Sequence, residues 1–215
     1  MEAQLPFSCR LETIFDIQLL VPVEAEVKLH YQQQQQLHGN HIPFPYWTRL
    51  WASSVALSGY IMESPELVSG KNILELGAGL ALPSFVGSRY ASNVICSDYL
   101  NDAVMLMKEN IRQLNLRNVQ ATQIDWTSLE IPDDVNLLLL SDVNYDPFTF
   151  DHLHRLISRY LSSQDKHAMI STPQRLTGKA FFEKLDPFIS MRTERNIFMN
   201  GVATNISVML LSPGL

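Results

Sequence analysis

Cysteine is scarce in this chain, which has two cysteines, Cys9 and Cys96, among 215 residues. The two lie far apart, and Cys96 falls in an apolar run, where a cysteine usually behaves as a small hydrophobic side chain. The pattern therefore predicts neither a disulfide framework nor a zinc site. Long apolar runs are lacking as well, because no stretch approaches the length needed to cross a bilayer.

Basic charge is also in short supply. The 16 Lys and Arg residues are outnumbered by 22 Asp and Glu residues, which gives a net charge of −6. Nucleic-acid binding normally uses a basic face, so we expect no nucleic-acid partner. The first twelve residues have no basic region followed by an apolar core, unlike a secretory signal. We therefore expect a cytoplasmic protein with no membrane partner.

Three histidines near the amino terminus give no metal site. His30, His38 and His41 flank five consecutive glutamines, but no carboxylate or thiol joins them at a familiar ligand spacing. We expect residues 32–36 to form a polar, solvated loop. They fall in an amino-terminal extension, residues 1–45, that begins with a strand or hairpin over residues 7–23 and packs on the remaining domain, residues 46–215.

The rest of the chain alternates between strand-like and helix-like segments. With 46% hydrophobic residues, it is large enough for one domain with a substantial core. Helical periodicity is found over residues 47–62, 100–114, 150–161 and 181–188. Strands are expected over residues 73–76, 93–98, 119–124, 135–140, 167–171, 189–198 and 206–211. This order predicts an α/β fold that ends in an antiparallel pair, joined by the turn signal Asn200-Gly201.

Residues 71–99 are the stretch that the other elements support. An apolar strand ends abruptly in Gly77-Ala78-Gly79, and a second strand ends in Asp98, about twenty residues later. Ligands of open α/β sheets bind at the carboxyl ends of the strands. The turn would let the backbone approach a nucleoside, and Asp98 would accept hydrogen bonds from its ribose hydroxyls.

The details of the turn favour S-adenosylmethionine as that nucleoside. A dinucleotide site would need a third glycine, where this chain has Ala81 and Leu82. Glu75, two residues before the turn, would lie at the mouth of the crevice near the ammonium group of S-adenosylmethionine. A dinucleotide and a purely structural turn are the alternatives.

Aromatic residues accompany this crevice. Asp125 and Trp126 end the third strand, where hydrogen bonding and stacking would hold an adenine; alternatively they are a turn acid and a core tryptophan. Trp47 and Trp51 recur one turn apart in the predicted helix of residues 47–62. Tryptophans in such a pair are commonly core residues, but this helix precedes the cofactor strand, so one of them could cover the cofactor.

Four stretches together resemble the methyltransferase-like proteins of family 16, which include the protein lysine methyltransferases. They are PYWTRLWASSVALSGYI at residues 45–61, ILELGAGLALPS at 73–84, CSDY at 96–99 and LLLLSDVNYDPFTF at 137–150. Ala81 replaces the usual last glycine of the motif. The resemblance runs from about Tyr46 to the carboxyl terminus. It implies a three-layer, Rossmann-like class I methyltransferase fold with a seven-stranded, mostly parallel sheet and an antiparallel carboxyl-terminal hairpin.

The resemblance also implies roles for particular residues. Those that match cofactor contacts of the family are Trp51, the turn Gly77-Ala78-Gly79, Asp98, Trp126 and Ser141. Asp142 and Tyr145 match its D-x-x-Y motif, beside the transferred methyl group. We expect Asp142 to orient the acceptor amine and Tyr145 to form part of an aromatic wall; alternatively, Asp142 caps a helix that begins near Phe148 and Tyr145 only packs.

The implied activity is S-adenosylmethionine-dependent methylation of a protein lysine. Methylation of a small amine or other metabolite is the second hypothesis. A cofactor-binding interaction protein without catalysis is the third.

Overall fold

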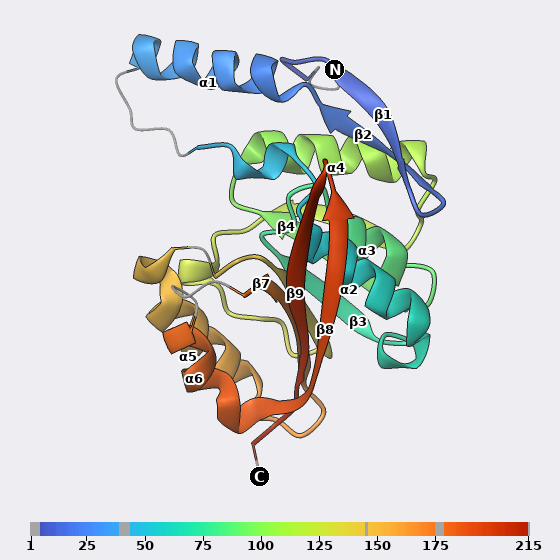
Figure 1. The fold of residues 1–215 in the computed structure, drawn as a ribbon, viewed down its shortest axis with the longest axis vertical. Coiled ribbons are helices and arrows are strands. Elements are labelled where there is room, and N and C mark those ends of the chain that lie inside the picture. Colours follow the sequence, from blue (N-terminus) through green and yellow to red (C-terminus); the bar gives the residue numbers. More distant parts are fainter. Residues whose placement is uncertain (1–4, 39–43, 145, 175–178, 215) are drawn as a thin grey trace.

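A computed structural model describes residues 5–38, 44–144, 146–174 and 179–214, and Figure 1 shows its fold. Its main sheet has seven strands in the order β5-β4-β3-β6-β7-β9-β8. The strands are β3 (Asn72–Leu76), β4 (Asn93–Asp98), β5 (Val119–Gln123), β6 (Leu137–Ser141), β7 (His167–Pro173), β8 (Ile189–Met199) and β9 (Val202–Leu211). The pairs among β3 to β7 are parallel, and β9 runs antiparallel to both β7 and β8. The predicted mostly parallel sheet is thereby confirmed.

The terminal hairpin forms where its turn residues predict it. Asn200 and Gly201 both have positive φ, 51° and 78°. A tight turn with left-handed residues matches the twist of the two flanking strands. The hairpin places β9 between β7 and the edge strand β8.

Helices cover both faces of the sheet, which gives three layers (Figure 1). One face carries α2 (Ala52–Glu63), α3 (Leu82–Gly87) and α4 (Asn101–Gln113), and the other carries α5 (Phe150–Tyr160) and α6 (Lys179–Leu185). The alternation of β3 divides its side chains between these cores, with Ile73 in the first and Leu74 in the second. Among the described residues, no helix is both long enough and apolar enough to cross a membrane.

The amino-terminal strands form a small sheet of their own. β1 (Cys9–Ile14) and β2 (Ile17–Pro22) pair antiparallel with each other, as the predicted hairpin requires. Asn110 of α4 holds this hairpin: its Oδ1 accepts from the N–H of Leu20 at 2.7 Å, and its Nδ2 donates to the Leu20 carbonyl at 3.1 Å. The buried amide therefore acts as one more strand residue facing β2.

The glutamine run is helical, so the predicted loop over residues 32–36 is wrong. It lies in α1 (Glu24–His38), the helix at the top of Figure 1. Glutamine is a good helix former, and the first turn is favoured by Glu24 and Glu26. Val27 and Tyr31, four residues apart, are buried and fasten the helix to the domain. The low complexity of this segment therefore does not mean that it lacks structure.

The predicted helix of residues 47–62 starts later than expected. Residues Tyr46–Thr48 form a single 3₁₀ turn, η1, and Trp51 precedes α2 with extended backbone angles. The Ser54 hydroxyl and N–H both bond to the Trp51 carbonyl, which fixes the start of α2. Trp47 and Trp51 therefore do not lie on one helix.

Candidate active site

The glycine turn lies at the carboxyl end of β3 and has the conformation that needs glycine. Gly77 and Gly79 have φ of 62° and 55°, and Ala81 also has positive φ, 56°. A Cβ atom built on Gly77 would lie 3.2 Å from Cγ1 of Val143 and 3.7 Å from the ring of Trp126. The turn thus meets the segments that follow β5 and β6, as the crevice hypothesis requires.

Asp98 ends β4 beside this turn. Its Oδ2 accepts from the N–H of Gly79 at 3.2 Å, and its Oδ1 accepts from the N–H of Leu100 at 3.1 Å. Burial raises the pKa of Asp98, while the bonds from these N–H groups act in the opposite direction. The carboxylate is held rigidly next to the glycines, which is where a ribose contact is expected.

Glu75 lies beneath the turn instead of at the mouth of the crevice, so that part of the sequence interpretation is wrong. The side chain is fully buried, and its Oε2 accepts from both the N–H and the hydroxyl of Ser84, at 3.0 and 2.6 Å. Ser84 belongs to the first turn of α3, whose free N–H groups attract a carboxylate. Burial raises the pKa of Glu75 to about 8. A contact between Glu75 and the cofactor stays a prediction.

The two tryptophans before α2 have different environments. A Cβ atom on Gly79 would lie 3.5 Å from Cα of Trp47, so η1 packs against the turn. Trp47 is buried, with its ring 5.6 Å from that of Phe7 and its Nε1 donating to the Tyr31 hydroxyl at 3.4 Å. The sequence left open which of Trp47 and Trp51 lies at the crevice, because a contact made through the backbone of Trp47 leaves no mark in the sequence.

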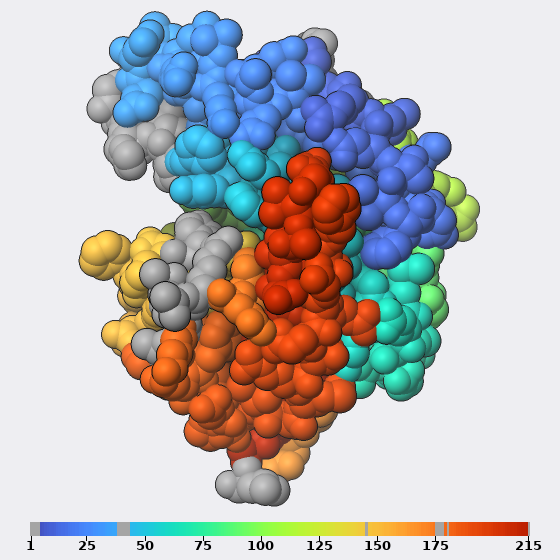
Figure 2. Space-filling view, in the orientation of Figure 1, coloured from blue at the N-terminus to red at the C-terminus, as the bar shows by residue number. Residues whose placement is uncertain are grey.

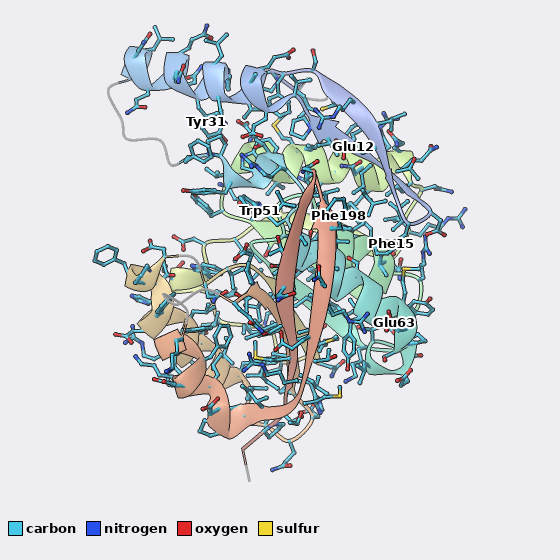
Figure 3. The ribbon with its side chains drawn as sticks, viewed as in Figure 1. Glu12, Phe15, Tyr31, Trp51, Glu63 and Phe198 are labelled. Carbon is cyan, nitrogen blue, oxygen red and sulfur yellow. The ribbon has the colours of Figure 1, made fainter. Side chains whose placement is uncertain are left out.

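Trp51 is the tryptophan that stays accessible. Its Nε1 donates to the Tyr46 carbonyl at 2.9 Å, and the guanidinium of Arg49 lies 5.1 Å from the centre of its ring. Figure 3 shows Trp51 below Tyr31, between α1 and the sheet. A cofactor contact of Trp51 stays a prediction.

Asp125 and Trp126 follow β5 as expected, and they have separate local functions. Asp125 is exposed and caps the 3₁₀ helix η3 (Trp126–Ser128), because its Oδ1 accepts from the N–H and the hydroxyl of Thr127 at 2.9 and 2.8 Å. These bonds lower the pKa of Asp125. Trp126 is half-buried and packs beside the position of a Gly77 Cβ. An adenine contact is a prediction for both.

The end of β6 carries Ser141 and Asp142. Asp142 is buried, has φ of 54°, and donates its N–H to the Ser171 carbonyl at 2.9 Å. The Ser171 hydroxyl lies 3.3 Å from that of Ser141. Left-handed backbone at a residue other than glycine is tolerated best by Asn and Asp, and it turns Asp142 out of the strand direction.

The residues after Asp142 lead into the 3₁₀ turn of Pro147–Thr149. The helix-cap alternative for Asp142 is wrong, because Asp146 caps the turn at Phe148. Tyr145 lies outside the described residues. Asn144, which the sequence interpretation passed over, is buried with an Oδ1 that has no hydrogen-bond partner within the described part of the chain. The sequence signal for Asn144 is that it is a polar residue inside the D-x-x-Y stretch, next to the proposed site residues.

Solved methyltransferases share the fold of this chain. Magnesium protoporphyrin IX methyltransferase from Synechocystis, solved with bound S-adenosylmethionine, matches with a TM-score of 0.58 at 13% identity, over 85% of this chain and 91% of its own. A tRNA (uracil-54, C5)-methyltransferase from Pyrococcus abyssi, solved with S-adenosyl-L-homocysteine, matches with a TM-score of 0.59 at 14% identity, over 95% of this chain and 44% of its own. The fold is that of the class I methyltransferases.

Proteins that are similar in sequence identify the family of methyltransferases to which this chain belongs. A zebrafish electron transfer flavoprotein beta subunit lysine methyltransferase is 30% identical over 143 residues, 66% of this chain and 53% of the relative. The human histone-arginine methyltransferase METTL23 is 28% identical over 132 residues, 58% and 69% of the two chains. The Candida glabrata protein N-terminal and lysine N-methyltransferase EFM7 is 28% identical over 148 residues, 61% and 57% of the two chains. Residues 45–188 match the lysine methyltransferase family, and the chain belongs to that family.

The residues present fit the cofactor of this family, S-adenosylmethionine. The match to zebrafish and human flavoprotein methyltransferases spans about half of those relatives' length. Within residues 45–188, which match the family, this chain has two features that a nucleoside site needs. A Cβ atom on Gly77 would fill the space between Val143 and Trp126, and the carboxylate of Asp98 ends the neighbouring strand.

Proposed function

We propose that this protein is an S-adenosylmethionine-dependent methyltransferase that methylates a nitrogen atom of a protein, first of all a lysine side chain. The observation that carries the proposal is the closeness of the Asp142 segment to the glycine turn. Val143, the residue after Asp142, lies 3.2 Å from the position of a Gly77 Cβ. Asp142, which is suited to hold the acceptor, is therefore adjacent in sequence to Val143, which borders the glycine turn.

The chain's own residues divide the work between cofactor and acceptor. S-adenosylmethionine, when bound, supplies an electrophilic methyl group. Gly77, Gly79 and Asp98 would hold its nucleoside, with Trp126 against the adenine and Ser141 and Trp51 at its borders. Positioning supplies much of the rate in such displacements.

Asp142 would act on the acceptor. A lysine amine has a pKa of about 10.4, so it must lose a proton before its lone pair can attack. A buried carboxylate at the end of β6 can accept a hydrogen bond from the amine and aim that lone pair. Tyr145 is proposed as part of an aromatic wall beside the lysine stem.

The relatives guide the choice of acceptor without fixing it. Their names give a lysine of a flavoprotein subunit, a protein amino terminus or lysine, and a histone arginine. All of these are nitrogen atoms of proteins, which supports a protein acceptor over a metabolite. A small amine is the second candidate, and a non-catalytic cofactor-binding protein is the third.

Domain limits and location are further parts of the proposal. We propose residues 46–215 as the methyltransferase domain and residues 1–45 as an extension packed on it; the separate pairing of β1 with β2 supports this division. A cytoplasmic location, without a nucleic-acid or membrane partner, stays a prediction from composition. Cell fractionation of a tagged chain would test the location.

Two measurements test the function. Isothermal titration with S-adenosylmethionine and S-adenosylhomocysteine separates a cofactor-binding protein from one with a purely structural turn. Transfer of tritiated methyl groups into a lysate, followed by acid precipitation, then separates protein from small-molecule acceptors. Binding without any transfer would favour the non-catalytic hypothesis.

A further inference from the structure

Phe148 is an aromatic residue that stands almost entirely in water. Its side chain is 93% exposed, although it follows Asp142 by only six residues. A single exposed hydrophobic residue is ordinary on a protein surface. The feature that sets Phe148 apart is the hydrogen-bonded turn that carries it.

The turn that carries Phe148 is built to be rigid. Asp146 accepts from the N–H of Phe148 at 3.0 Å through its Oδ1, and its carbonyl accepts from the N–H and hydroxyl of Thr149 at 3.0 and 2.8 Å. Pro147 fixes the first position of this 3₁₀ turn, η4 (Pro147–Thr149). Phe150 anchors the end of the turn, with its ring buried 5.3 Å from that of Phe181. The backbone that carries Phe148 is therefore fixed by hydrogen bonds, which lowers the entropy cost of ordering this turn in a contact.

A second set of accessible aromatic side chains precedes α2: Phe44 and Tyr46 are exposed and Trp51 is half-buried, and we call these three residues the aromatic strip. Ring centres are 4.7 Å apart between Phe44 and Tyr46, and 6.3 Å apart between Tyr46 and Trp51. A cation lies over each end of the strip. Lys28 is 5.1 Å from the Phe44 ring, and Arg49 is 5.1 Å from the Trp51 ring.

The charges of the aromatic strip are unequal. Oε1 of Glu24 lies 2.6 Å from both Lys28 and Arg49, so one carboxylate serves two cations. This leaves a positive excess among these three side chains, in a chain whose net charge is −6. An acidic side chain is the complementary partner.

Figure 2 shows a hollow between the light-blue atoms of residues 44–51 and the gold atoms that follow residue 146. We propose that Phe148 and the aromatic strip form the two lips of a docking site for a protein acceptor. An apolar side chain near the methylated residue packs on Phe148, and an acidic side chain of the same segment lies on the strip. This inference rests on the proposed function and specifies its substrate.

The exposure of Phe148 distinguishes a protein acceptor from a small one. A ring that is 93% exposed lies outside the crevice, and a small amine held at Asp142 has no atoms to cover it. A protein segment passes over both lips while its acceptor nitrogen enters the hollow. Exposed aromatic residues around a crevice commonly contribute to such interfaces.

The test compares methyl transfer by Phe148→Ala, Phe148→Leu, Lys28→Gln and the wild-type protein. Each is incubated with tritiated S-adenosylmethionine and a dilution series of lysate from cells that lack the protein, and acid-precipitable label is counted. Phe15→Ala is the matched control, since Phe15 is 45% exposed on the β1–β2 turn and lies across the molecule from Trp51 in Figure 3. Cofactor affinity is titrated for every variant.

We expect Phe148→Ala to lower protein labelling about tenfold at limiting lysate, with a smaller deficit as the lysate is concentrated. Phe148→Leu restores most of the labelling, and Lys28→Gln lowers it about threefold. Cofactor affinity is unchanged in all of them, and Phe15→Ala behaves as wild type.

Other outcomes overturn the inference in distinguishable ways. Equal labelling by wild type and Phe148→Ala removes the docking role but leaves the proposed function intact. A change in oligomeric state of Phe148→Ala by light scattering, with labelling unchanged, makes the ring a contact between copies of this chain. Label found only in the acid-soluble fraction removes the protein acceptor, and no transfer by the wild type removes the proposed function as well.

Discussion

Ser84 gives both of its hydrogen bonds to one oxygen of Glu75, from its N–H at 3.0 Å and its hydroxyl at 2.6 Å. The other oxygen of Glu75 is buried with no hydrogen-bond partner within the described residues. Strand β3 and helix α3 are thereby joined directly beneath the glycine turn, through an acid that has no access to water.

This arrangement predicts a pH-dependent stability. The pKa of Glu75 rises from 4.5 to about 8 on folding. Between these values the unfolded chain has released the proton while the folded chain keeps it, so the stabilisation, complete below pH 4.5, is lost as the pH rises to about 8. The free energy of unfolding, measured with urea, should be lower at pH 8 than at pH 5 in the wild type, by an amount on the order of kcal/mol. The decrease should be smaller in Glu75→Gln. Glu66→Gln, an exposed control, should keep the wild-type slope; equal slopes for all three would contradict the assignment.

Gly77→Ala should abolish most cofactor binding. Its backbone needs φ of 62°, and the added Cβ would crowd Val143 at 3.2 Å and enter the crevice. Gly70→Ala is the matched control, with φ of 69° and no atom within 4 Å of the added Cβ. Both variants should lose about 1 kcal/mol of stability from backbone strain. Titration with S-adenosylhomocysteine should separate them, and similar affinities would show that Gly77 does not border the ligand.

Asp98→Ala should weaken cofactor binding by about 1.5–3 kcal/mol, the range for losing charge-assisted hydrogen bonds, without unfolding the domain. The carboxylate is fixed by the N–H groups of Gly79 and Leu100, so it is already placed for a ribose. Isothermal titration and a melting curve check the two halves of this expectation. An unchanged dissociation constant would refute the ribose contact.

Asp142→Asn should lower turnover about a hundredfold and leave cofactor affinity and melting temperature near wild type. Asparagine tolerates the φ of 54° found here, so the change removes charge without straining the backbone. The comparison variant is Asp146→Asn, whose side chain caps η4. If turnover and cofactor binding fall together in Asp142→Asn, the residue belongs to the cofactor site instead.

The sequence was sufficient for the sheet and for the strand ends that surround the crevice. Apolar runs and the glycines at residues 77 and 79 are local signals, and parallel strands bring their ends together by topology. It was insufficient where a distant partner decides the conformation. The glutamines of α1 are ordered through Val27 and Tyr31, and Glu75 is drawn under the turn by Ser84, nine residues later. Neither partner could be identified before the fold was known.

The contact of Trp47 with Gly79 couples two parts of the molecule thermodynamically. Trp47 lies against the turn on one side and bonds to Tyr31 of α1 on the other. A ligand that orders the turn must therefore also favour the docked form of the helix, and by linkage the helix raises the affinity for that ligand. Amide hydrogens of α1 should exchange more slowly once the crevice is filled.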